Sequence, residues 1–80
     1  MLNMYVFEDV LWDWTSGMVL IAAEDLQDAQ QIAYQEYNYR KDNILEDFLE
    51  QQGGFKEAAG VYPLAPGANK GVLHSVHGGG

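Results

Sequence analysis

Two strand-like runs joined by a short turn constrain the fold of this chain more than any other feature. Residues 4–14 read MYVFEDVLWDW and are dense in aromatic and β-branched residues, with Trp12 and Trp14 on one side of an alternating pattern. The TSG turn at 15–17 ends in glycine, for which a positive φ has little cost, and MVLIAA at 18–23 is an apolar run of strand length. The stretch predicts a β-hairpin.

The adjacent carboxylates Glu8 and Asp9 interrupt the alternation of the first run. On a flat strand one of two neighbouring side chains must point inward, and a buried carboxylate is costly. We therefore expect a bulge or a sheet edge at this pair.

Residues 24–41 predict an amphipathic helix. Asp25 is placed to cap its N-terminus, and Arg40 and Lys41 lie at its C-terminal end, where positive charge suits the helix dipole. The apolar stripe, at spacings of three and four, consists of Leu26, Ala29, Ile32, Ala33 and Tyr37.

A second helical pattern follows directly. Asn43 and Glu46 form an Asn-x-x-Glu capping box, and Gly53-Gly54 ends the pattern. Its apolar stripe holds Ile44, Leu45, Phe48 and Leu49. The two patterns predict either two helices or one bent helix.

Two short β-like runs, 59–64 and 71–77, flank a Pro-Gly-Asn loop whose length suits a wide hairpin connection, and Pro63 places the first run at an edge. The order ββ, α or αα, ββ predicts an α+β fold, a small antiparallel sheet with one or two helices packed on one face. We expect one domain over residues 1–77 and a flexible glycine tail at 78–80.

Charge and composition narrow the function classes. The net charge of −8 disfavours direct binding to nucleic acid or to an anionic membrane and favours a basic protein or nucleoprotein partner. The absence of cysteine excludes disulfides and thiolate metal sites. The longest nearly uncharged run is too short for a membrane span, so we expect a cytoplasmic protein.

No catalytic, cofactor or metal motif appears in the sequence, and we expect a protein that is not an enzyme. Ser16 and Ser75 have no patterned base. His74 and His77 are three residues apart, and such positions on a strand project to opposite faces, so they do not chelate one ion.

The candidate partner-binding residues are acidic and aromatic. Glu46, Asp47 and Glu50 share the helix face opposite the apolar stripe, Asp42 precedes them, and no lysine or arginine lies between 42 and 55. One helical turn separates positions 46 and 50 by roughly 6 Å, comparable to the spacing of phosphates along a nucleic-acid strand. The alternative is an acidic face that serves only solubility.

Tyr34 and Tyr39 add an aromatic signal, because the helix stripe is already filled and both tyrosines are expected to point partly outward. Tyrosine is enriched at protein interfaces. We predict a partner-binding site made of these two tyrosines and the four acidic residues.

The stretch FEDVLWDWTSGMVLIAAEDLQDAQ, with the small size and acidic charge, resembles small acidic phage-encoded anti-defence proteins, including anti-CRISPR families. The resemblance implies a non-catalytic inhibitor that occupies a nucleic-acid channel or a protein interface. The layout and the ending VLHSVHGGG resemble, less closely, ubiquitin-like β-grasp proteins. That likeness implies conjugation through Gly80, although no arginine precedes the glycines and a third glycine is present.

The leading hypothesis is a phage-type inhibitor that docks on the basic groove of a host nucleic-acid-binding complex, as a monomer or a small homo-oligomer. The alternatives are a small phage structural or assembly factor that self-associates through the face carrying Trp12 and Trp14, and a ubiquitin-like protein that uses its C-terminal Gly-Gly.

Overall fold

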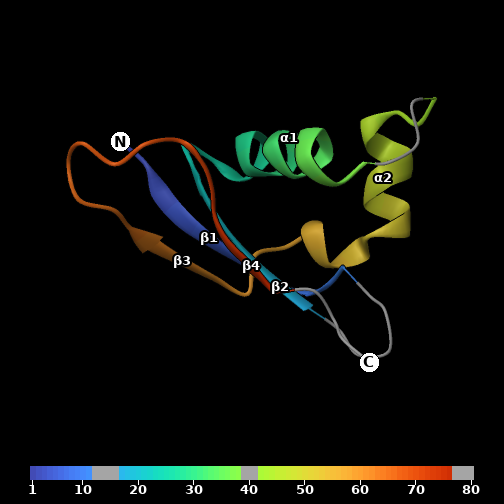
Figure 1. Cartoon of the computed structure of the whole chain (residues 1–80), viewed down its shortest axis with the longest axis horizontal. Coiled ribbons are helices and arrows are strands. Elements are labelled where there is room, and N and C mark those ends of the chain that lie inside the picture. Colours follow the sequence, from blue (N-terminus) through green and yellow to red (C-terminus); the bar gives the residue numbers. More distant parts are fainter. Residues whose placement is uncertain (12–16, 39–41, 77–80) are drawn as a thin grey trace.

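A four-stranded antiparallel sheet carries the helices on one of its faces (Figure 1). The computed structural model describes residues 1–11, 17–38 and 42–76. The sheet has the order β3-β1-β2-β4 and is built from β1 (Asn3–Val10), β2 (Gly17–Ala23), β3 (Gly60–Pro63) and β4 (Gly71–Val76). The predicted α+β class and the predicted pairing of the first two strands are confirmed.

The acidic pair of β1 lies at a bulge, as predicted. The pairing with β2 shifts between Glu8 and Val10, which makes Asp9 the extra residue, with a positive φ of 58°. Aspartate tolerates this left-handed conformation better than most residues. The bulge keeps both carboxylates exposed and returns Val10 to full burial in the core.

The last two strands do not form the predicted hairpin. β3 pairs with β1 and β4 pairs with β2, so they occupy opposite edges of the sheet. The connection contains a tight turn, with a hydrogen bond from the Ala68 N–H to the Ala65 carbonyl oxygen at 3.2 Å and Gly67 at φ 91°. Pro followed by a positive-φ Gly is typical of a type II turn. Such a turn lets the chain cross the end of the sheet, because about seven residues easily span the roughly 14 Å between outer strands.

Helix α1 (Leu26–Tyr37) packs on the sheet and is capped as predicted, because the Asp28 backbone N–H donates to the Asp25 side chain at 2.7 Å. The helix is shorter than expected and ends at Tyr37, with no basic residue in its last turn. The predicted basic end, Arg40 and Lys41, lies outside the described residues.

Helix α2 (Leu45–Gln51) is separate from α1, so the chain has two helices rather than one bent helix. The predicted capping box is wrong: Ile44 is the N-cap residue, and no side chain bonds the first turn. The Asn43 side-chain amide instead contacts the side-chain oxygens of Asn38 and Gln51, each at 3.3 Å. Ile44, expected in the apolar stripe, is 57% exposed.

A short 3-10 helix, η1 (Gly53–Phe55), places Phe55 at the centre of the core. Its ring lies 5.1 Å from Phe7 of β1, 5.5 Å from Phe48 of α2 and 6.2 Å from Tyr37 of α1, measured between ring centroids. Aromatic pairs at such separations stabilise beyond their buried area. Phe55 therefore joins the sheet to both helices.

Candidate functional site

The buried side of α2 determines where its acidic side chains lie. Phe48 is 2% exposed and packs in the core, and Leu45 and Leu49 are half-buried against it. Glu46, Asp47 and Glu50 are all exposed, as expected for positions on the opposite side of an amphipathic helix. The predicted exposure of these acids is confirmed.

Three of the four predicted acidic residues line one groove of about 530 Å³, beside α1 and η1. Its lining consists of Gln30, Glu46, Asp47, Leu49, Glu50 and Lys56. Lys56 bonds Glu50 at 2.9 Å, and both side chains are largely exposed. In the described part of the chain, no basic side chain pairs with Glu46 or Asp47. The groove is acidic with one internal cation at its rim.

Gln30 and Lys56 were not among the predicted site residues. The Gln30 side-chain amide donates to the Phe55 and Lys56 carbonyl oxygens, at 3.0 and 3.3 Å, and so fixes the turn that carries Lys56 to α1. The sequence contains no local signal for this contact, since the two residues are 26 positions apart.

The other predicted residues take different positions. Asp42 is exposed before α2 and does not line the groove. Tyr34 is half-buried: its hydroxyl donates to the Asn43 carbonyl oxygen, and its ring meets Phe48 edge-on at 5.7 Å. Tyr34 therefore packs within the molecule and fixes the position of the segment before α2. Tyr39, like Trp12, Trp14 and the glycine tail, lies outside the described residues.

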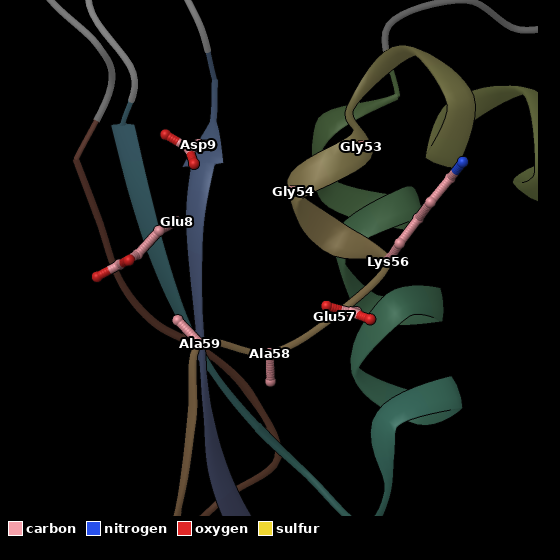
Figure 2. Close-up of a pocket in the computed structure, with 8 residues that line it drawn as sticks. All are labelled: Glu8, Asp9, Gly53, Gly54, Lys56, Glu57, Ala58 and Ala59. Carbon is pink, nitrogen blue, oxygen red and sulfur yellow. The ribbon is translucent and has the colours of Figure 1, made fainter.

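A second hollow, of about 440 Å³, lies on the other side of η1, between it and β1 (Figure 2). Gly54 forms part of its wall. A Cβ atom at Gly54 would lie 2.2 Å from the Glu8 carbonyl oxygen and 2.6 Å from that of Asp9, so only glycine allows this approach to the bulge. The Leu11 N–H donates to the Gln52 side-chain oxygen at 3.0 Å and adds a second link.

The carboxylates around this second hollow do not converge. Figure 2 shows Glu8 pointing away from Gly54 on the far side of β1, and Lys56 extending away from β1. Within residues 1–11, 17–38 and 42–76, no three His, Asp or Glu side chains are placed to hold a metal ion. His74 is exposed on β4, and His77 is not described.

An ion pair ties the connection after β3 to the start of α1. Lys70 lies 3.0 Å from the Asp28 carboxylate, which also accepts the Glu24 backbone N–H at 3.0 Å. The Glu24 N–H and the Lys70 ammonium hold the pKa of the Asp28 carboxyl below its ordinary value. The same carboxylate raises the pKa of Lys70.

No known protein family, curated protein or solved structure matches this chain. In the part of the chain that the structure describes, neither helix has the length and apolar character needed to cross a membrane.

Proposed function

We propose that this chain is a non-catalytic binding protein that uses the acidic groove of α2 to occupy a basic, nucleic-acid-binding surface of another protein. The observation that carries the proposal is the gathering of Glu46, Asp47 and Glu50 on one exposed surface. The finer form of the proposal is inhibition: a partner whose basic surface is covered no longer binds its nucleic acid.

The spacing of the acids supports this choice of partner. Glu46 and Glu50 are one helical turn apart, roughly 6 Å, a spacing comparable to that of phosphates along a nucleic-acid strand, and Asp47 lies beside them. A lysine or arginine surface arranged for a nucleic-acid strand would meet carboxylates at similar intervals.

The Glu50–Lys56 ion pair is a contact that a cation of the partner could replace. An exposed ion pair contributes little to stability and exchanges readily with another cation. An arginine of the partner would replace Lys56 with a two-pronged contact to Glu50. Charge steering would raise the association rate and make it sensitive to salt.

The test compares two variants of equal net charge. The groove variant carries Glu46→Gln, Asp47→Asn and Glu50→Gln in the groove, together with Asp42→Asn, the fourth predicted acidic residue, which lies outside it. The control neutralises four exposed carboxylates elsewhere: Glu8→Gln, Glu24→Gln, Glu36→Gln and Glu57→Gln. Each change takes the net charge from −8 to −4. Proteins captured from a bacterial lysate by wild type and by both variants are quantified by mass spectrometry.

A partner of the groove is a basic protein that wild type and the control retain and the groove variant loses. Adding wild type to that partner should displace a labelled duplex DNA or RNA, while the groove variant should not. Equal capture by both variants would show that only net charge matters and would refute the proposal.

A further inference from the structure

The outer face of the sheet, opposite the helices, is apolar. The strand register places Met4 and Val6 of β1 beside Ala22 and Leu20 of β2 on this face. Neighbouring positions extend the face onto the outer strands, where Tyr62 pairs with Met4, and His74 and Val76 pair with Leu20 and Met18. We define the outer face by Met4, Val6, Met18, Leu20, Ala22, Tyr62, His74 and Val76.

None of these side chains belongs to the packed core cluster, although Ala22, between its neighbours in the sheet, is fully buried. The core cluster contains the alternate residues of the same strands, Tyr5, Phe7, Val19 and Ile21. Met4, Val6, Met18 and Leu20 are only half-buried, and Tyr62 and Val76 at the edges are 54% and 46% exposed. Figure 1 shows α1 and α2 on the other side of the sheet.

Charge is nearly absent from this face despite the acidic chain. Among the paired strand residues that the structure describes, Glu8 is the one carboxylate on this face. It lies at one end, where it pairs with Met18. Nine of the twelve acidic residues lie between positions 24 and 57, in or beside the helices. Electrostatic repulsion between two copies would therefore act between their helical sides and not between their outer faces.

We infer that the outer face binds a second copy of this chain, so that two sheets stack with the helices outside. This occupant suits the charge distribution. Stacked sheets lie about 10 Å apart and each helix layer adds about 10 Å, so the acidic layers of the two copies stand roughly 30 Å from each other, well beyond the Debye length of about 8 Å at physiological salt. A strongly basic partner would find almost no complementary charge on this face.

The area of the outer face suits a dimer that forms weakly and reversibly. Four strands at about 4.8 Å spacing and about 20 Å length present roughly 400 Å² of flat surface per copy, or about 800 Å² for two, before side-chain relief is included. Apolar patches of this size often mark interaction sites, and interfaces at this end of the range are weak and transient. The proposal does not depend on the acidic groove, which remains outside the dimer.

The experiment measures molecular mass by sedimentation equilibrium from low micromolar to near-millimolar concentration. Wild type should shift from the 8.9 kDa monomer toward twice that mass. Leu20→Lys, at the centre of the outer face, should raise the dissociation constant at least tenfold. Ile44→Lys is the matched control, since it places the same lysine at an exposed apolar position on α2 and should leave the dissociation constant unchanged.

Circular dichroism shows whether each variant is folded. If Leu20→Lys fails to fold, Val76→Lys takes its place in the measurement of the dissociation constant. The Val76 side chain is already 46% exposed, so its replacement leaves the core intact. A wild-type mass that stays at the monomer value throughout would overturn the inference. So would a folded outer-face variant that dimerises as well as Ile44→Lys.

Discussion

The two helices are held in the molecule by different kinds of interaction. The N-terminus of α1 is closed by neighbouring residues: Asp28 donates its N–H to Asp25 and accepts the N–H of Glu24. The N-terminus of α2 has no side-chain cap, and seven residues are too few for a helix to persist by itself. α2 persists because Phe48 packs on Phe55 and because η1 is seated on the bulge of β1.

This difference shows how an acidic surface is positioned on a short helix. The inner side of α2 is anchored through η1, so its outer side needs no stabilising contacts and is available for charge. α1 is capped by its own sequence and packs directly on the sheet, whereas α2 has no side-chain cap and is joined to the sheet through η1. A change at the bulge should therefore affect α2 much more than α1.

Gly54→Ala should give the largest effect, because the added Cβ meets two backbone carbonyl oxygens that cannot move aside. We expect a loss of about 3 kcal/mol in the free energy of unfolding, the upper end for overpacking. The whole stability of a chain of this size is about 4–12 kcal/mol. Urea denaturation followed by circular dichroism measures the loss.

Gly53→Ala is the matched control for this change, because nothing lies within 4 Å of its added Cβ. It should alter the free energy of unfolding by no more than about 0.5 kcal/mol. Equal effects at the two glycines would show that η1 is not seated on the bulge.

Asp25→Ala should give an intermediate effect. It removes the cap of α1 and should cost about 1 kcal/mol. Asn43→Ala makes the same test at the start of α2, where the side chain does not cap, and should cost only a few tenths of a kcal/mol, as for surface substitutions. Thermal unfolding of both variants measures the two losses of stability. A larger loss for Asn43→Ala than for Asp25→Ala would contradict the difference proposed between the two helices.

The sequence predicts those parts of the fold that depend on neighbouring residues. The cap at Asp25, the buried stripe of α1 and the bulge at Glu8-Asp9 each follow from local patterns, and the structure confirms them. The cap at Asn43 had an equally good local pattern. It is wrong because residues beyond the first turn of α2 hold Asn43: its carbonyl oxygen accepts from the Tyr34 hydroxyl of α1, and its side chain contacts Asn38 and Gln51.

The same distinction applies to β3 and β4. A Pro-Gly turn is compatible with a hairpin and with a crossing connection, and the choice depends on which sheet edges the hairpin of β1 and β2 leaves open. In the candidate site, helical periodicity was sufficient to predict that Glu46, Asp47 and Glu50 are exposed. The contact of Glu50 with Lys56 was not predictable, because η1 turns the chain between them.

The smallest expected effect is on the pH dependence of stability, through Asp28 at the N-terminus of α1. Because the folded protein lowers the pKa of Asp28, its carboxylate stabilises the fold above the ordinary aspartate pKa of about 3.9, and this stabilisation disappears as the pH falls through the lower folded value. The melting temperature of wild type should therefore exceed that of Asp28→Asn by a constant amount above about pH 5, and the two curves should converge below about pH 4.

Asp47→Asn is the control for this measurement, since it removes an exposed carboxylate of α2 that has no basic partner among the described residues. Asp47→Asn should change the melting temperature at neutral pH much less than Asp28→Asn does. Molar salt should reduce the Asp28→Asn difference without abolishing it, because salt screens Lys70 but leaves the hydrogen bond from the Glu24 N–H in place. A difference that vanished completely in salt would mean that the contribution of the Asp28 carboxylate comes from its ion pair with Lys70 and not from its hydrogen bond with the Glu24 N–H.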